Sequence, residues 1–409
     1  MPVYSTSYSL PYLVLLTYFV LLMFMEFRCL KFEQDTKYVR WATMAGFVFF
    51  FGLRGFVNTD WLVYYNIFNG LPTLWGGNLG SAFTTDFTSE FVTDASTDQA
   101  GIEMGFIFLT VLFKSIIPDY FAWVFVNVVI DVILLDIFFR RYSKYYVLSF
   151  ILFLIFGGLG IEFNLMRNVK AILLFLISLK YIEERKIVPY MLLNIAGCTL
   201  HTSALFFIPL YFFLNKEWPK WVIWTIFIVG NILVLLQISY LKPIVLAITD
   251  MMGGRMAVKA RLYFASDLYS RSVGVGLSYF ERTATFVLSV WLLPKLKERN
   301  PSIVMFVNSY ILFFFAYFFF SEIMIAIQRI TLLFAFSYWI IYPEILGLLE
   351  KSINKLVMVS VVVVYSVVIL IKTNSNIFAK YDNQVFGIES YDDRKQVVST
   401  ELESVLEQK

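Results

Sequence analysis

Arginine, carboxylate and imidazole side chains lie beside apolar segments in this chain, where they could bind an anion and move a proton. The clearest case is NLMRNVKAILLFLISLKYIEERK, 164–186, in which Arg167 precedes an apolar run. Glu103 opens another apolar stretch, and His201 interrupts a third. A guanidinium stays charged and binds phosphate oxygens through paired hydrogen bonds, whereas a carboxylate or an imidazole can take up a proton. These residue types therefore predict a phosphate-binding site at Arg167, with His201 or Glu103 as the proton acceptor.

The composition is that of a membrane protein. The chain has 409 residues, of which 59% are hydrophobic and 15% charged, and its mean hydropathy is +0.73. These values indicate a polytopic membrane protein. The net charge of +3 is too small to argue for a nucleic-acid partner. Cys29 and Cys198 suggest neither a disulfide framework nor a zinc site, and the first apolar run lacks the features of a cleaved signal peptide.

Apolar runs of nearly spanning length predict about twelve transmembrane helices. Loops rich in Lys and Arg are expected in the cytoplasm, and this bias orients the helices. The stretch 102–117 is short and is expected to lie on the outer surface or to re-enter, and a turn is predicted at 157–164. The predicted spans are 9–27, 38–54, 120–139, 145–160, 168–182, two short helices in 187–214, 220–238, 277–293, 301–320, 330–349 and 355–371.

The block 187–214 leaves two alternatives open. One tilted helix or two short helices would both fit its length. Two helices with His201 at an outer turn keep Lys216 and Lys220 in the cytoplasm, so we favour them. The sequence HTS also suggests a helix N-cap, in which Thr202 or Ser203 would accept the first free amides.

The predicted fold is an all-α polytopic bundle with short or re-entrant helices at its outer face. Its transmembrane domain would comprise 1–371, with outer loops 55–119 and 239–276 forming the active face. A polar C-terminal tail, 372–409, is expected outside the cytoplasm. Within span 120–139, Asp131 is expected to face the bundle interior and to pack with Asn127.

This outer face collects polar residues that are unusual for a membrane protein. Charge at a helix centre costs about 2.5–3.5 kcal/mol, and the positive-inside rule disfavours Arg on this side. Some of these residues, such as Arg255 and Arg271, could simply be solvated. The set is Arg54, Asp60, Tyr64, Glu103, Arg167, Asn168, His201, Arg255, Arg261, Arg271, Arg282 and Arg329.

Transfer of a sugar from a polyprenyl diphosphate would use such a set. The leaving diphosphate gathers charge, which arginines can stabilise. The outer segments carry no Asp-x-Asp pair, so we expect neither a metal nor another cofactor.

Four ordered sequence elements resemble those of the EpsG family. They are LRGFVNTDWLVYY (Arg54, Asp60, Tyr64) for R-x-G-x-G-x-D-x-x-x-Y, Glu103-x-Gly105-Phe106 for E-x-G-Y/F, Asn164-x-x-Arg167 with Ala171 for N-x-x-R-Q-x-x-A, and HTSAL (201–205) for H-T/Y-S-A-L. Arg329 and Tyr381 fall where the family has a late Arg and a C-terminal Tyr. The chain departs from the pattern at Asn168, which replaces Gln, in the Phe-Val-Asn run before Asp60, and in the Ala-Lys pair before Tyr381.

The resemblance implies a Wzy-like polymerase of bacterial surface polysaccharides. Such a protein would have a GT-C-like fold and would act at the outer side of the inner (cytoplasmic) membrane. Without a metal, it would join oligosaccharide repeats carried on undecaprenyl diphosphate. The implied partners are that lipid-linked oligosaccharide, membrane lipids, a flippase and a chain-length regulator.

On this reading Arg167 holds the diphosphate, and His201, with Glu103 as its rival, orients or deprotonates the acceptor. Arg329 and one or more of the loop arginines would assist Arg167. The residues expected to bind diphosphate or sugar are Arg54, Asp60, Tyr64, Asn164, Asn168, Arg255, Arg261, Arg271, Arg282, Arg329 and Tyr381. Two alternatives stay open: an O-antigen ligase-like glycosyltransferase, and a flippase or transporter for lipid-linked oligosaccharide.

Overall fold

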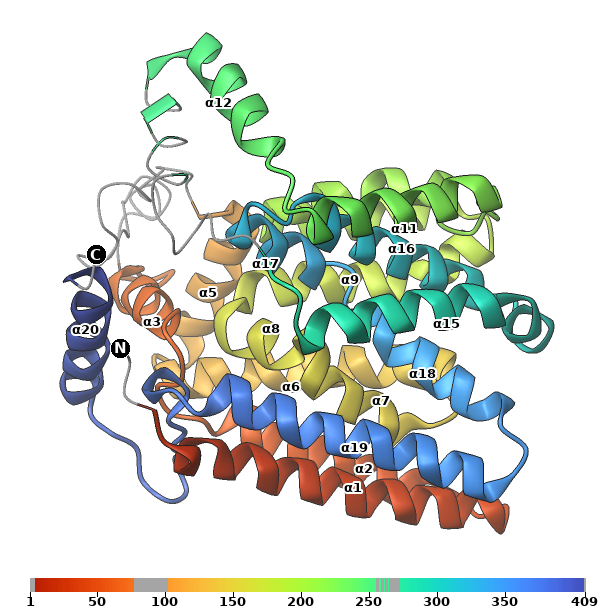
Figure 1. Cartoon of the computed structure of the whole chain (residues 1–409). Coiled ribbons are helices and arrows are strands. Elements are labelled where there is room, and N and C mark those ends of the chain that lie inside the picture. Colours follow the sequence, from red (N-terminus) through yellow and green to blue (C-terminus); the bar gives the residue numbers. More distant parts are fainter. Residues whose placement is uncertain are drawn as a thin grey trace. The chain divides into compact units, whose positions relative to one another are not determined.

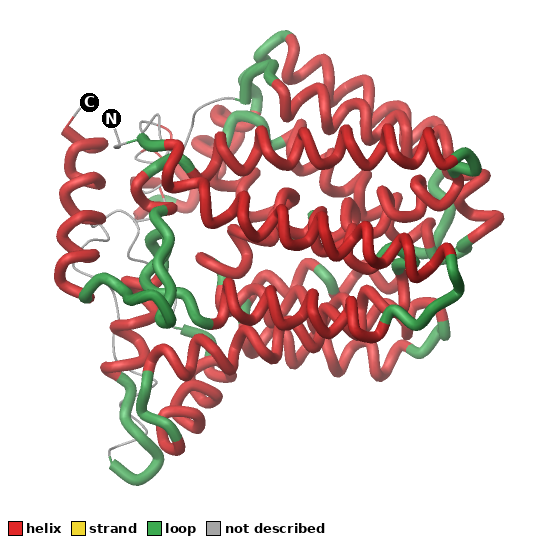
Figure 2. Tube along the Cα trace, turned by 90° about the horizontal axis from the view of Figure 1, so that it is seen from below, coloured by secondary structure: helices red, strands yellow, loops and turns green. Residues whose placement is uncertain are grey.

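The computed structural model describes residues 4–76, 102–254, 257, 258, 261, 264 and 273–407. Its named elements are all helical, and the described residues contain isolated β-bridges but no strand (Figure 2). The predicted all-α class is therefore confirmed. The chain divides into two compact units (Figure 1). Unit 1 lies within Met1–Val92, Asp98–Pro209 and Leu349–Lys409, and unit 2 includes Leu210–Leu348.

Unit 1 contains the helices of the N-terminal half of the chain and those of its C-terminal end. They are α1 (Leu10–Lys31), α2 (Lys37–Phe47) with its π-helical extension Val48–Gly52, α3 (Trp61–Gly70), α5 (Met104–Ile116), α6 (Tyr120–Tyr142), α7 (Tyr146–Phe153), π-helical Leu154–Gly158, α8 (Leu159–Asn164), α9 (Met166–Glu183), α10 (Ile187–Leu200), the 3-10 helix η4 (Thr202–Phe206), α19 (Ser352–Asn374), the 3-10 helix Ile377–Ala379 and α20 (Tyr391–Glu407). A further 3-10 helix, Ile208–Phe212, follows η4 and spans the point in the chain where unit 1 ends and unit 2 begins.

Unit 2 is formed by the middle of the chain. Its helices are α11 (Lys220–Leu235), α12 (Leu241–Met252), α15 (Leu277–Arg299), α16 (Ile303–Phe319), α17 (Met324–Leu332) and α18 (Phe336–Leu348).

Four helical segments of the described chain are long and apolar enough to cross a membrane. They are Thr6–Lys31, Tyr120–Tyr142, Tyr146–Asn164 and Ser352–Asn374. Several other apolar helices are shorter; α5, for example, has 13 residues and so extends about 20 Å, less than the hydrocarbon thickness. These helices are consistent with a helical membrane protein, and the count of about twelve spans stays a prediction.

Helix α1 packs beside α2, α7 and α19 in unit 1 (Figure 1). Glu26, which is buried on α1, accepts the backbone amides of Tyr146 at 2.8 Å and Val147 at 3.1 Å. These are among the first amides of α7, which have no partner within their own helix. One carboxylate therefore closes the start of α7 and joins it to α1.

The predicted turn at 157–164 is wrong. Gly157 has φ +92°, which is open to glycine, and the chain bends there and continues as α8. The break predicted at His201 is present: α10 ends at Leu200, His201 is extended, and η4 begins at Thr202. The two-helix alternative for this block is therefore the one observed.

Helix α9 packs against α6, α8 and α10. On its buried face the Lys170 ammonium pairs with Asp131 of α6 and donates to the Asn127 carbonyl oxygen at 3.2 Å. Asn127 was the expected partner of Asp131. In the structure Asn127 instead accepts a hydrogen bond from Lys170 through its backbone carbonyl oxygen. Lys170 was not predicted as the partner of Asp131, because sequence spacing alone does not show which faces of two helices meet.

The C-terminal segment packs against the loop that follows α2. Gly55 N donates to Asp382 O at 3.1 Å, and Asn58 N donates to Phe378 O at 2.8 Å. Arg394, on α20, is 1% exposed and donates to four backbone carbonyls, those of Phe56, Ile377, Phe378 and Lys380. Segment 372–409, expected as a polar tail, thus supports the loop that leads into α3.

Candidate functional site

Glu103 lies at the centre of the candidate site. It is the N-cap residue of α5, and its Oε2 accepts Nη1 of Arg167 at 2.6 Å. Its other oxygen, Oε1, accepts the backbone amide of Thr202 at 3.1 Å. The carboxylate therefore joins α5, the first turn of α9 and the start of η4 at one point.

Arg167 is positioned by two partners from other elements. Besides Glu103, the Tyr64 hydroxyl of α3 interacts with its side chain and its backbone amide. Burial raises the pKa of Tyr64, and the neighbouring Arg167 opposes this rise. Its hydroxyl thus stays protonated at neutral pH. The Arg167 side chain is 25% exposed, so the guanidinium is held in place while part of it remains accessible.

His201 forms the other side of the site. It caps η4 itself, because its Nδ1 accepts the Ser203 amide at 3.2 Å; the predicted caps, Thr202 or Ser203, were wrong. The Ser203 hydroxyl lies 2.8 Å from Nδ1 and donates to Asn168 Oδ1 at 2.6 Å. Nδ1 of His201 is therefore engaged with Ser203.

Small residues allow these elements to approach closely. A Cβ on Gly105 would lie 2.4 Å from Thr199 Oγ1 and 2.7 Å from the Thr199 carbonyl oxygen. Only glycine therefore fits where α5 crosses the end of α10. At Gly197 of α10 a Cβ would meet Ala204 at 3.2 Å and the backbone of Ala171 at 3.6 Å. These contacts hold Glu103 and His201 close to Arg167.

Helix starts converge on this cluster, which we define as Tyr64, Glu103, Arg167, Asn168 and His201. Glu103 and His201 are N-cap residues, and Arg167 and Asn168 lie in the first turn of α9. The first amides of a helix lack intrahelical partners and carry partial positive charge. A guanidinium beside such amides favours an anion. In this structure the anion present is the Glu103 carboxylate.

Arg54 and Tyr381 lie instead where the C-terminal segment meets the end of α2. Arg54 is buried, donating to the carbonyl oxygens of Phe51 at 2.8 Å and Glu162 at 2.9 Å. Tyr381 stacks on Phe50 with ring centroids 4.3 Å apart and donates to its carbonyl at 2.8 Å. Burial raises the pKa of Tyr381 to about 12, so it remains a donor. Both residues support the loop leading to α3, and a substrate would have to replace these contacts.

The remaining predicted residues of unit 1 flank the cluster. Asp60 is the N-cap residue of α3, and its charge bears on the Tyr64 hydroxyl. Asn164 ends α8, and its buried Oδ1 has no hydrogen-bond partner among the described residues. An unsatisfied buried acceptor three residues before Arg167 is a candidate contact for a substrate hydroxyl.

The predicted arginines of the later chain belong to unit 2. Arg261 pairs with Asp250 at 3.0 Å, and Arg282 lies over the Tyr317 ring at 3.6 Å. Arg329 is exposed on α17. Arg255 and Arg271 lie outside the described residues, so their expected role stays a prediction. In the part of the chain that the structure describes, no group of three or more His, Cys, Asp or Glu side chains is arranged to hold a metal ion.

Comparison with known protein families identifies the family of this chain. The EpsG family model matches residues 37–384. This chain belongs to the EpsG family. Its membership indicates a membrane protein of the polysaccharide polymerase type. No curated protein and no solved structure matches the chain.

Every member of the cluster is among the residues predicted from the sequence of this EpsG-family protein, but the contacts that connect them were not predicted. Ser203 was considered only as a helix cap, although it links His201 to Asn168. The backbone amide of Thr202 was not considered as a ligand for Glu103. The HTSAL motif gave a signal for both, since its polar residues directly follow His201.

Proposed function

We propose that this protein is a polysaccharide polymerase. It transfers a glycan chain from one undecaprenyl-diphosphate-linked repeat to the terminal sugar of another, at the outer face of the bacterial cytoplasmic membrane and without a divalent metal. The single observation that carries this proposal is the Glu103–Arg167 pair at converging helix starts, in a chain of the EpsG family.

The donor diphosphate takes over the contacts that Glu103 makes in the free protein. Its oxygens accept from Arg167 and from the Thr202 amide, as the carboxylate does in this structure. Charge grows on the diphosphate as the glycosidic bond breaks, and preorganised donors stabilise that charge more strongly than the starting state. The guanidinium and the helix-start amides thus stabilise the charge of the leaving diphosphate, which a metal ion stabilises in other glycosyltransferases.

Glu103, displaced from Arg167, takes the acceptor proton. The terminal-sugar hydroxyl oxygen attacks the anomeric carbon of the donor and forms the new C–O bond. The bond between that carbon and the diphosphate oxygen breaks, and its electron pair leaves with undecaprenyl diphosphate. The hydroxyl proton passes to the Glu103 carboxylate, which therefore acts as general base.

His201 orients the acceptor in this scheme. Because Nδ1 accepts the Ser203 amide, the neutral ring carries its proton on Nε2. A protonated Nε2 is a donor, so it binds a sugar oxygen and does not remove a proton. This tautomer of His201 therefore favours the Glu103 carboxylate over the imidazole as the base.

Reconstituted polymerisation tests the proposal. The purified full chain in nanodiscs is given a synthetic undecaprenyl-diphosphate-linked repeat with EDTA, and the products are resolved on a gel. We expect a ladder. A ladder that needs added Mg²⁺ would contradict the arginine-based account, and addition of the glycan to a different acceptor without a ladder would indicate a ligase. Transport of the repeat across the membrane without any product would indicate a flippase.

A further inference from the structure

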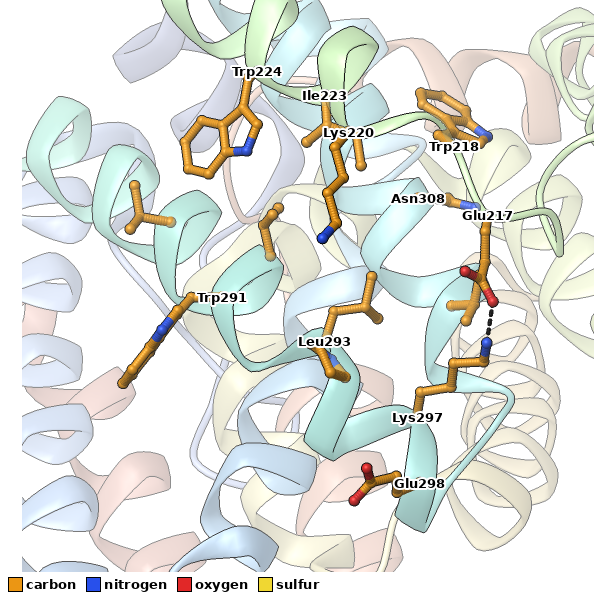
Figure 3. Close-up of a pocket in the computed structure, with 14 residues that line it drawn as sticks. Glu217, Trp218, Lys220, Ile223, Trp224, Trp291, Leu293, Lys297, Glu298 and Asn308 are labelled. Carbon is orange, nitrogen blue, oxygen red and sulfur yellow. Dashed lines mark hydrogen bonds and ion pairs between the residues drawn. The ribbon is translucent and has the colours of Figure 1, made fainter.

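A groove in unit 2 separates α11 from α15 (Figure 3). Both helices pack against α16, which contributes Val304 and Asn308 to the lining. The groove encloses about 800 Å³, a volume in the range of small-molecule sites. It lies within unit 2 alone and contains no residue of the cluster described above.

The groove has a closed, aromatic end. The rings of Phe227 and Phe286 lie 5.1 Å apart, and Phe286 lies 4.5 Å from Phe314. Tyr279 also donates to Asn231 Oδ1 at 2.6 Å, which ties α15 to α11 beyond these rings. The two helices are antiparallel, so the other end of the groove lies between the start of α11 and the end of α15.

The lining changes from apolar to charged along the groove. Ile223, Trp224, Val290, Trp291 and Leu293 form apolar walls. The open end instead carries two basic and two acidic residues: Glu217, Lys220, Lys297 and Glu298. Trp side chains prefer the level of the lipid headgroups in a membrane. The groove thus matches the polarity of a lipid, with a tail site and a headgroup site.

One of the two lysines at the open end lacks a carboxylate partner among the described residues. Lys297 pairs with Glu217, whereas Lys220 has no carboxylate partner among the described residues and its amino group points into the groove (Figure 3). The three further basic residues of this end, which are exposed, are Lys216, Lys295 and Arg299. The Lys220 ammonium, which no carboxylate among the described residues pairs with, complements the phosphate of an anionic headgroup. Such a basic helix end is expected in the cytoplasmic leaflet.

We propose that this groove binds an anionic glycerophospholipid of the cytoplasmic leaflet. One acyl chain lies along the Trp224 and Trp291 walls, and the headgroup phosphate accepts hydrogen bonds from Lys220. The site is separate from the proposed polymerase chemistry, so failure of either proposal leaves the other standing.

Lipid retention tests this assignment. The full chain is exchanged into mixed vesicles of phosphatidylglycerol and phosphatidylcholine, re-extracted in mild detergent and analysed by native mass spectrometry. We expect selective retention of phosphatidylglycerol, and about fivefold less retention in Lys220→Gln. Lys295→Gln is the matched control, because it removes the same charge from the same helix end outside the groove. Val290→Trp, which fills the groove, should also reduce retention.

Three results would overturn the proposal. One is equal retention of both phospholipids, and another is an equal effect of Lys220→Gln and Lys295→Gln. The third is preferential retention of undecaprenyl phosphate when it is added as a competitor, which would reassign the groove to the lipid carrier. Size-exclusion profiles matching the parent chain confirm that each variant is folded before its lipids are counted.

Discussion

Glu103 and Arg167 lie 64 positions apart in the chain, and their side chains meet at 2.6 Å. Both belong to the start of a helix, Glu103 as the N-cap of α5 and Arg167 in the first turn of α9. The pair is partly buried, so it is less screened by solvent than a surface pair. This relationship connects the two sequence elements that the EpsG resemblance placed in one site.

Replacing Glu103 by Gln should abolish most polymerisation while preserving the fold. Gln can still accept the Thr202 amide, but it cannot take a proton as a general base. Loss of general-base catalysis costs about 10²–10⁴-fold in rate, and we expect a loss in this range. The measurement is the initial rate of ladder formation. Glu184→Gln, an exposed site on the opposite end of α9, is the control, and an equal effect in both variants would contradict the assignment.

Replacing Gly105 by Ala should impair the site through packing. The added Cβ would fall 2.7 Å from the Thr199 carbonyl oxygen, a backbone atom that no rotamer change can move. We expect α5 to shift from α10, with loss of the Glu103–Thr202 contact and destabilisation of about 1–3 kcal/mol. Thermal unfolding followed by intrinsic fluorescence measures the stability change.

Gly160→Ala provides the matched control for that experiment. A Cβ at this position would meet nothing within 4 Å, and the residue lies in α8. Ala should therefore stabilise the helix by about 0.5–1 kcal/mol. A Gly105→Ala variant as stable and active as Gly160→Ala would show that the close approach is not required.

The buried pair of Lys170 and Asp131 should matter more as a pair than as single charges. Lys170→Met leaves the Asp131 carboxylate buried without its cation, which should cost about 3–5 kcal/mol. The double variant Lys170→Met with Asp131→Asn should recover most of that loss, because no unpaired charge remains. The free energy of unfolding is measured for the parent chain, the two single variants and the double variant, which together give the coupling energy between the two residues. Additive effects of the two substitutions would refute the pairing.

Arg394 should hold the C-terminal segment in place. Burial lowers its pKa, an effect that Glu389 and Asp382 oppose. Arg394→Met leaves four backbone carbonyls without their hydrogen-bond donor. The free energy of unfolding should therefore fall by about 2–4 kcal/mol. Gln396→Met, an exposed position on the same helix, is the control. Proteolysis of 375–409 at equal rates in both variants would contradict this role.

The parts of the fold that follow from local patterns could be predicted from the sequence. Apolar runs gave the helical membrane class, and the polar HTS triplet gave the break at His201, because both depend on residues close together in the chain. The predicted turn at 157–164 failed because glycine permits a bend inside a helix as well as an end.

The contacts of the site depended on pairings that no local pattern contains. Lys170 and Asp131 lie on different helices, as do Glu103 and Arg167, and spacing does not reveal which helix faces meet. The ordered family motifs placed Glu103, Arg167 and His201 in one expected site, but they contained no information on how these residues pair. They contained none for Lys170, for Arg394 or for the Thr202 amide.

The guanidinium of Arg167 binds the diphosphate in the proposed mechanism, and the variant Arg167→Lys tests this role. Lys keeps the charge but cannot form two parallel hydrogen bonds to phosphate. With EDTA present and equal amounts of folded protein, polymerisation by Arg167→Lys should fall by at least about a hundredfold, whereas Arg185→Lys, an exposed residue just after α9, should retain the parent rate. Full activity of Arg167→Lys would show that diphosphate binding does not need the guanidinium.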